Sequence, residues 1–257
     1  GKGELLNKMS EFWFNKTKDI VPNHYISSVD PQVLLVKEAK PLPVEVIVRK
    51  YITGSLWRDY ENSKHHVYDL DFGDQLVKNQ KFETPILTPS TKEEYGKHDM
   101  PISKKEIINQ KLVDKDIYEL AEKYALQLFA EGEKWAKKQG LILVDTKYEF
   151  GLVNNELIVI DEIHTPDSSR YWVANEYESR FQNGEEQLML DKENIRQWLI
   201  SKGFSGDGTP PELDDDIRIL LSEKYIELYK ILTGKDFIPS NGDVSNRITN
   251  SLKNTGF

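Results

Sequence analysis

Cysteine is absent from the 257-residue chain, and only five histidines are present. The first absence excludes disulfides, thiol nucleophiles and cysteine-ligated zinc, and it fits a reducing, cytoplasmic location. The histidines are scattered, so we expect no histidine metal site. No apolar run approaches the roughly 20 residues of a membrane-spanning helix, and no signal-peptide pattern is present. We therefore expect no membrane partner.

Basic charge is also in short supply. Lysines and arginines number 34 against 43 aspartates and glutamates, which gives a net charge of −9. A nucleic-acid surface needs a broad basic patch, so we expect no nucleic-acid partner, although a local basic pocket could still bind a small anion. The apolar fraction of 38% suffices for a globular core, and the length allows one large domain or two modest ones.

Apolar periodicity and turn residues outline the secondary structure. Helices are predicted over residues 4–15, 116–139, 191–202 and 214–233, and a glycine follows each of the last three. Strands are predicted at 33–37, 43–51, 141–144 and 157–160. The stretches 65–83 and 88–99 are polar and read as loops, and the tail 240–257 is expected to be loose.

The strand predicted at 43–51 places two opposite charges on one face. Its three valines share one face, whereas Glu45 and Arg49 lie on the other. A buried sheet makes both charges costly unless they have partners. The second face of this strand is therefore predicted to line a site.

A second charged pattern follows the apolar run 141–144. Asp145, Lys147 and Glu149 alternate, so in extended chain their side chains converge on one patch, roughly 6–7 Å apart. Asp161 ends the next short strand, beyond the predicted Asn154-Asn155 turn. Carboxylates that hold a metal and a lysine that meets a phosphate suit a Mg-nucleotide, and protein kinases use a similar order of residues. The alternative is a solvated strand end.

The segment Thr53-Gly54-Ser55 predicts a turn from a strand into a helix. Free N–H groups at a helix N-terminus bind phosphate readily, and Ser55 and Arg49 would add donors. The alternative is that Thr53 or Ser55 simply caps the helix.

Five motifs in the chain occur in the order found in the SAICAR synthetases (phosphoribosylaminoimidazole-succinocarboxamide synthases). They are PVEVIVR at 43–49, TGS at 53–55, TPSTK at 88–92, VDTKYEFG at 144–151 and DEIHTPDSSRYW at 161–172. The resemblance extends from residue 1 to about Pro239, and it is stronger to the longer, yeast-like branch than to the short bacterial one.

This resemblance implies an α+β, two-lobed fold similar to protein kinases and ATP-grasp enzymes. Residues 1–38 would be the remaining part of the N-terminal lobe up to the hinge, 39–239 the larger lobe with the nucleotide and substrate sites, and 240–257 the loose tail. The family's glycine- and lysine-bearing hairpin over the ATP phosphates has no counterpart in this sequence, so we expect the N-terminal lobe to be incomplete.

The activity implied by the resemblance is an ATP-dependent ligation in de novo purine biosynthesis. L-aspartate is joined to the carboxylate of CAIR (carboxyaminoimidazole ribonucleotide), through an acyl phosphate, to give SAICAR, ADP and phosphate. ATP and Mg²⁺ are the implied cofactors, and CAIR and L-aspartate are the small-molecule partners. The protein is expected to be a monomer or a homodimer.

The resemblance also assigns candidate roles to individual residues. The catalytic candidates are Asp145, Lys147 and Glu149. The nucleotide-binding candidates are Val36, Lys37, Glu38, Ala39, Glu45, Lys147, Glu149 and Asp161, of which Glu45 and Asp161 are the candidate Mg²⁺ ligands. The substrate-binding candidates are Arg49, Thr53, Gly54, Ser55, Lys92, Asp99, Ser169 and Arg170. Among these, Arg49, Ser55 and Arg170 would hold the CAIR phosphate.

Two other functions are compatible with the same motifs. A kinase-like small-molecule phosphotransferase would explain the order of acids and lysine but leaves Thr53-Gly54-Ser55 and Arg170 without a role. A non-catalytic nucleotide-binding remnant would explain the incomplete N-terminal lobe. Aspartate-dependent turnover distinguishes the ligase from both.

Overall fold

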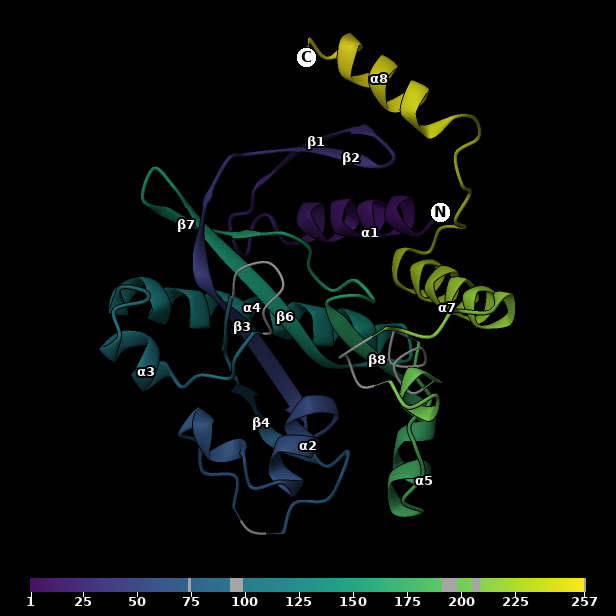
Figure 1. Ribbon diagram of the computed structural model, residues 1–257. Helices are drawn as coiled ribbons and strands as arrows, with labels where there is room; N and C mark the ends of the chain where they lie inside the picture. Colours follow the sequence, from purple (N-terminus) through teal and green to yellow (C-terminus); the bar gives the residue numbers. More distant parts are fainter. Residues whose placement is uncertain (74, 93–98, 191–197, 205–208, 257) are drawn as a thin grey trace.

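The computed structural model describes residues 1–73, 75–92, 99–190, 198–204 and 209–256, and it has an α+β fold (Figure 1). The helices are α1 (Lys2–Thr17), α2 (Gly54–Glu61), η1 (His65–Tyr68), α3 (Lys104–Asn109), α4 (Lys115–Lys138), η2 (Ala174–Glu176), α5 (Tyr177–Gln182), α7 (Asp215–Thr233) and α8 (Val244–Asn254). The strands are β1 (Tyr25–Asp30), β2 (Val33–Val36), β3 (Lys40–Tyr51), β4 (Lys81–Leu87), β5 (Ser90–Thr91), β6 (Leu141–Val153), β7 (Glu156–Ile160) and β8 (Ser169–Val173).

Two antiparallel sheets organise the strands. β1 and β2 form a hairpin of their own. The larger sheet has the order β4-β3-β6-β7, with β5 paired to β3 and β8 paired to β6. The two sheets are joined through residues 37–39, which is where the sequence predicted the boundary between lobes. That division into lobes stays a prediction.

The register between β3 and β6 places the predicted site residues opposite one another. Arg49 pairs with Asp145, and Glu45 pairs with Glu149. Side chains of directly opposed residues lie about 4.5–5.5 Å apart at Cβ, so the two charged patterns form one surface.

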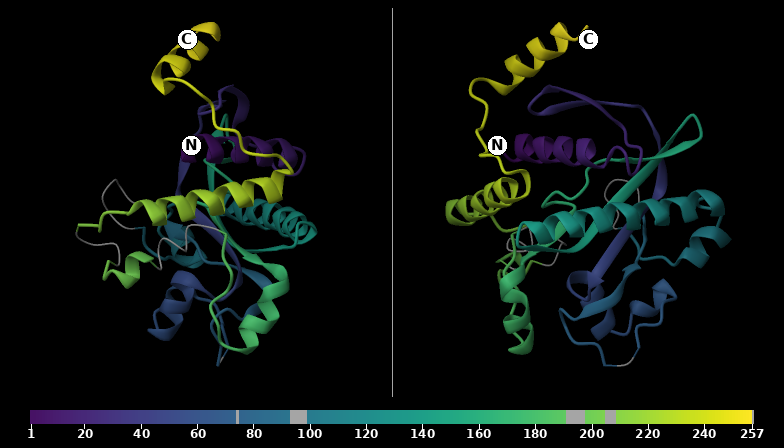
Figure 2. Two further views of the ribbon diagram at one scale, coloured as in Figure 1. Left: turned by 90° about the vertical axis from the view of Figure 1, so that its right-hand side faces the viewer. Right: turned by 180° about the vertical axis from the view of Figure 1, so that it is seen from behind.

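The other face of the sheet is the core. The three valines of β3 at positions 44, 46 and 48 are at most 1% exposed, and they belong to one apolar cluster with the buried side of α4. α4 lies across this face, which is toward the viewer in the right-hand view of Figure 2. Its buried residues include Ala121, Ala125 and Gly132, whose small size lets the helix approach the sheet closely. The charged residues of β3 and β6 lie on the opposite face of the sheet.

Most of the predicted elements are confirmed. The helices predicted over 4–15, 116–139 and 214–233 correspond to α1, α4 and α7, and Gly234 ends α7 in the left-handed conformation. The helix predicted over 191–202 lies largely outside the described residues, as does part of the loop 88–99. The polar stretch 65–83 is less irregular than predicted, because it contains η1 and the start of β4.

The prediction of a loose tail over 240–257 is wrong for residues 244–254, which form α8. This helix packs beside β1 (Figures 1 and 2). Arg247 Nε donates to Asp30 Oδ2 at 2.8 Å, and this hydrogen bond lowers the pKa of the buried Asp30. The partner lies 217 residues away along the chain, so local composition could not reveal it. Within the described part of the chain, no helix is both long and apolar enough to cross a bilayer.

Candidate active site

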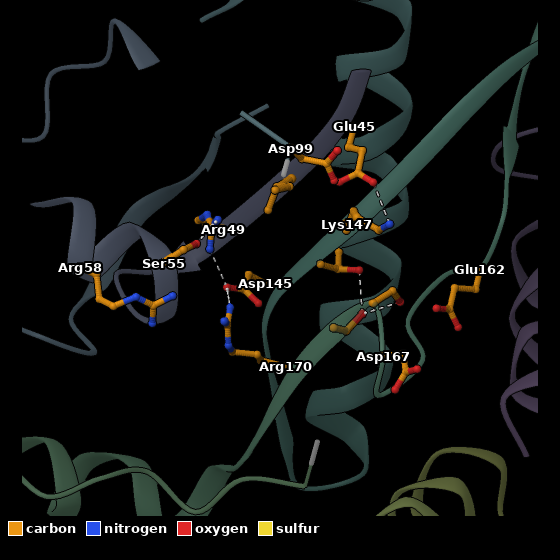
Figure 3. A pocket seen from close by; sticks show the side chains of 14 residues that line it. Glu45, Arg49, Ser55, Arg58, Asp99, Asp145, Lys147, Glu162, Asp167 and Arg170 are labelled. Carbon is orange, nitrogen blue, oxygen red and sulfur yellow. Dashed lines mark hydrogen bonds and ion pairs between the residues drawn. The ribbon is translucent and has the colours of Figure 1, made fainter. Parts of the chain in front are cut away.

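A cavity of about 480 Å³ opens on the charged face of β3 and β6 (Figure 3). Its walls come from these two strands, from α2, from Asp99 and from the chain between β7 and the start of β8. The lining residues are Glu45, Ile47, Arg49, Ser55, Arg58, Asp99, Asp145, Thr146, Lys147, Glu162, Asp167, Ser168, Ser169 and Arg170.

One end of the cavity is built around paired arginines. Arg49 Nη1 and Arg170 Nη1 both donate to Asp145 Oδ2, at 3.1 and 2.6 Å. Arg49 also donates to Ser55 Oγ at 3.1 Å and to Thr88 Oγ1 at 2.7 Å. Burial lowers the pKa of Arg49, although the neighbouring Asp145 counteracts this effect. One carboxylate thus holds two guanidinium groups side by side, which suits a phosphate monoester.

Gly54 is the residue that allows α2 to begin at this end of the cavity. Its φ is +58°, and an added Cβ would lie 2.3 Å from Arg170 Nη2 and 2.6 Å from Arg170 Cζ. Glycine is therefore needed both for the left-handed backbone and for the space that the guanidinium fills. The Thr53 side chain makes no capping hydrogen bond, and Ser55 bonds Arg49 instead, so the simple capping alternative is not supported.

The other end of the cavity is built around Lys147. Its Nζ donates to Glu45 Oε1 at 2.9 Å and to Glu149 Oε1 at 2.8 Å, and it lies 4.0 Å from Asp161 Oδ2. The second oxygen of Glu149 accepts a hydrogen bond from Lys92. Three carboxylates from three strand segments thus converge on one ammonium group.

Burial and charge change the protonation equilibria of this cluster. Burial raises the pKa of Glu45, and Lys147 only partly offsets it. Burial has the same tendency at Glu149, but hydrogen bonds from Lys147 and Lys92 outweigh it and lower its pKa to about 2. For Lys147 itself, desolvation opposes the charge, yet its hydrogen bonds to Glu149 and Glu45 raise its pKa. Lys147 is accordingly a permanent cation at physiological pH.

The chain between β7 and β8 forms one wall of the cavity through hydrogen bonds of its own hydroxyl groups. Thr165 Oγ1 donates to Glu162 Oε2 at 2.6 Å, and the Thr165 N–H donates to Ser168 Oγ at 3.1 Å. Ser169 Oγ donates to Thr146 Oγ1 on β6 at 2.7 Å. Burial raises the pKa of Glu162. These short-range bonds fix the wall against the sheet.

His164 anchors this wall from behind. The ring is fully buried, its Nε2 lies 2.5 Å from the Tyr148 hydroxyl, and it packs edge-on against Trp13. An added Cβ on Gly132 of α4 would lie 2.6 Å from His164 Cε1, so the ring occupies the space that a larger helix residue would need. Burial lowers the pKa of His164 to about 3, and the imidazole is neutral.

The cluster around Lys147 has donors of the kind that Mg²⁺ prefers. Glu45 and Asp161 offer carboxylate oxygens on either side of the ammonium group. Among the described residues, no three histidine, aspartate or glutamate side chains are grouped closely enough to form a metal site by themselves. The fit is therefore to a Mg²⁺ that takes the rest of its ligands from phosphate and water, as is usual for this ion.

The structure gathers most of the predicted residues. Eight of them line the cavity, namely Glu45, Arg49, Ser55, Asp99, Asp145, Lys147, Ser169 and Arg170. Glu149, Asp161 and Lys92 join through the Lys147 cluster. Thr53 and Gly54 line an adjoining cavity of about 310 Å³ that shares Arg170. Residues 36–39 do not line the main cavity. They do lie beside β6, the strand that carries Glu149, because a Cβ added to Gly151 of β6 would be only 3.0 Å from Ala39 Cβ.

Several lining residues were not predicted from the sequence. They are Arg58, Thr146, Glu162, Asp167 and Ser168, whereas Ile47 lies on the face of the strand 43–51 that was predicted to line a site. Arg58 could have been found, because it follows Gly54 and Ser55 by one helical turn and so faces the same way. Glu162 had only its position next to Asp161 as a signal, and nothing local shows which of the two adjacent acids faces the cavity.

The cavity thus has one end that suits a phosphate monoester and another that suits a metal-bound polyphosphate. This combination defines an enzyme that brings two phosphorylated small molecules together. The family model for SAICAR synthetase matches residues 1–211. A phosphoribosylaminoimidazole-succinocarboxamide synthase of Bacteroides thetaiotaomicron is 43% identical over 98% of this chain and 82% of its own length.

Solved structures agree with this sequence relationship. A SAICAR synthase from Saccharomyces cerevisiae complexed with SAICAR has a TM-score of 0.78 and 35% identity, covering 93% of this chain and 83% of that one. A SAICAR synthetase in complex with ADP has a TM-score of 0.69 and 26% identity, covering 93% and 84%. The chain therefore belongs to the SAICAR synthetase family of ATP-dependent carbon–nitrogen ligases of purine biosynthesis.

Proposed function

We propose that this chain joins L-aspartate to CAIR within the cavity between β3, β6 and α2, with the arginine end holding CAIR and the Lys147 end holding ATP. The observation that supports this most strongly is that an arginine cluster and a lysine–carboxylate cluster lie next to each other on one face of the sheet. Arg49 and Arg170 meet at Asp145, and Lys147 lies two residues along the same strand, between Glu45 and Glu149. A reaction between a carboxylate of one substrate and the phosphate chain of the other needs such neighbouring sites.

At the arginine end, Arg49, Ser55 and Arg170 are proposed to bind the phosphate of CAIR. Two guanidinium groups and a hydroxyl supply donors in a planar, forked arrangement that matches phosphate oxygens. Asp145 already accepts from both arginines. Its proposed role is therefore to orient them, in preference to taking a proton from the amine. Thr53, Gly54 and Ser169 are proposed to shape the surroundings of this substrate.

At the other end, Lys147 is proposed to neutralise charge on the transferred phosphoryl group. Glu45 and Asp161 would hold Mg²⁺, which supplies further neutralisation of phosphate charge when it is bound. Glu149 would fix Lys147 or hold the ribose, and the backbone of residues 36–39 would meet adenine. Lys92 and Asp99 are proposed to contact the base of CAIR or the aspartate.

The chemistry proceeds in two steps. In the first, an oxygen of the CAIR carboxylate bonds to the γ-phosphorus of ATP, the bond from that phosphorus to the β,γ-bridging oxygen breaks, and ADP leaves. In the second, the aspartate nitrogen bonds to the carboxyl carbon of the acyl phosphate, and phosphate leaves with the electron pair of the carbon–oxygen bond. The ammonium group of aspartate loses two protons in total, one to the departing phosphate and one to solvent.

A coupled assay of ADP release tests this proposal. Purified protein is given ATP, Mg²⁺ and CAIR, with and without L-aspartate, and the products are separated by chromatography. We expect aspartate-dependent ADP release with equimolar SAICAR. Phosphorylated CAIR that accumulates without aspartate incorporation would instead favour the phosphotransferase alternative, and ATP binding without turnover would favour a non-catalytic protein.

Cytoplasmic location and a monomeric or homodimeric state remain proposals. Cell fractionation can check the first, and light scattering can check the second.

A further inference from the structure

The carboxylates that line the cavity differ in how their charge is balanced. Asp145 accepts from two arginines, and Glu45 accepts from Lys147. Asp167 forms an ion pair with Lys2 at 2.9 Å and accepts from the Tyr225 hydroxyl. Asp99 also interacts with another residue of the chain.

Glu162 is the exception among these acids. Within the described residues it forms no ion pair, and its single hydrogen bond is the one that Oε2 accepts from Thr165. That bond orients the carboxylate while Oε1 stays available. The side chain is half-buried in the cavity wall, and Figure 3 shows its carboxylate turned toward the cavity. A partly buried carboxylate without a cation is costly, unless a ligand supplies the cation.

The substrates of the reaction supply one candidate. CAIR and ATP are anions, and L-aspartate carries two carboxylates and one ammonium group. The aspartate amine is accordingly the one cationic group of an organic substrate that must enter the cavity. We propose that Glu162 receives the amine of L-aspartate and positions it against the acyl phosphate. This inference rests on the proposed ligase function.

The expected contribution has two parts. Before reaction, the negative charge of Glu162 attracts the ammonium group and so selects an amino acid over a plain dicarboxylate. During the attack, the nitrogen gains positive charge as its electron pair forms the bond to carbon. A hydrogen bond from this nitrogen to Glu162 Oε1 strengthens at that moment, which lowers the barrier.

The main test compares Glu162→Gln with the wild-type protein in steady-state assays with three varied substrates. Glutamine keeps the size of the side chain and its bond from Thr165 but removes the charge. We expect the KM for L-aspartate to rise about ten- to hundredfold, which is the usual value of a charged hydrogen bond, with the KM values for CAIR and ATP within about twofold of wild type. Glu162→Asp keeps the charge and should recover part of the loss. Glu156→Gln, the same change at the exposed first residue of β7, should leave the kinetics unchanged.

A neutral nucleophile separates this role from a structural one. Hydroxylamine is uncharged at neutral pH and traps acyl phosphates as hydroxamates, so it needs no anionic partner. We expect Glu162→Gln to retain hydroxylamine-dependent ADP release with CAIR while it loses aspartate-dependent turnover. A parallel loss with both nucleophiles, or an equal rise in the KM for CAIR, would overturn the proposal.

A measurement on the wild-type protein does not depend on whether the variant folds. Succinate has both carboxylates of aspartate but no amine. We expect the inhibition constant of succinate, measured against L-aspartate, to be at least about tenfold higher than the KM for L-aspartate. An inhibition constant equal to this KM would overturn the proposal. Failure of the ligase function would look different, because wild-type protein would then release no ADP with either nucleophile.

Discussion

Gly54→Ala tests the arginine end of the cavity by a change that removes no functional group. The added methyl would lie within 3.0 Å of three atoms of the Arg170 guanidinium, and this group would have to move. Its 2.6 Å hydrogen bond to Asp145 would be lost or lengthened as a consequence. Both guanidiniums depend on that carboxylate, so the proposed phosphate site would open.

The magnitude has two separable parts. An alanine in the left-handed region costs about 1–2 kcal/mol, and in a chain of this size each kcal/mol lowers Tm by about 2–4 °C. A misplaced charged hydrogen bond to the CAIR phosphate costs about 1.5–3 kcal/mol of binding, which corresponds to roughly a ten- to 150-fold rise in KM. The first part changes stability alone, and the second changes the interaction with CAIR and adds the loss of the Arg170–Asp145 bond to the stability change.

Gly140→Ala is the matched control. Gly140 also has a positive φ, of +76°, but an added Cβ there has no atom within 4 Å. Thermal denaturation should show a loss of Tm in both variants, larger in Gly54→Ala because the Arg170–Asp145 bond is also disturbed, whereas CAIR titrations should show a higher KM in Gly54→Ala alone. An unchanged KM in Gly54→Ala, or an equal rise in both variants, would refute the assignment of Arg170 to the substrate site.

Three further predictions concern the scaffold around the site. In a helix interior, Gly132→Ala would normally add about 1 kcal/mol of stability, but here the methyl would lie 2.6 Å from His164 and 2.8 Å from Leu143. We therefore expect the free energy of unfolding to fall by about 1–3 kcal/mol, and a more stable variant in urea denaturation would contradict this. His24 and His164 have pKa values lowered by burial to about 4 and about 3, below the ordinary value of 6.5, so the unfolded chain binds protons that the folded chain does not. Stability should therefore fall as the pH drops from 6.5 toward 4, by about 2 kcal/mol per histidine at pH 5, and equal free energies of unfolding at pH 7 and pH 5 would show that the rings are not buried as neutral groups. Arg247→Gln removes the charged partner of Asp30, and we expect faster amide exchange across α8 with little change in α4; unchanged exchange in α8 would mean that other contacts hold the helix.

The alternation of charge and apolar residues in two segments was sufficient to predict the sheet face of the site. A strand repeats every two residues, so the valines of β3 had to share the face opposite Glu45 and Arg49. The same rule placed Asp145, Lys147 and Glu149 together. The register that sets Arg49 opposite Asp145 was not predictable, because it depends on hydrogen bonds between strands nearly a hundred residues apart in sequence.

Predictions failed where a residue's role depends on a distant partner. The polar composition of residues 244–254 predicts a loose tail, whereas the bond that holds α8 comes from Asp30 near the other end of the chain. Glu162 is part of a recognised motif, but the sequence gives it no role, because its significance depends on the absence of an ion pair among the described residues, which only the three-dimensional positions of the charges reveal. Gly54 was predicted as part of a turn, but the guanidinium that requires it is 116 positions later.

The sequence by itself determined the types of element and the chemistry available to the site, because periodicity and residue type act over a few neighbouring positions. Its ordered motifs also determined the family. The tertiary structure decided which charges are paired, because burial and distance between remote segments set the energy of a charge. It thereby decided that Asp145 holds two arginines and that Lys147 joins three carboxylates, while Glu162 faces the cavity without an ion pair to any residue that the structure describes.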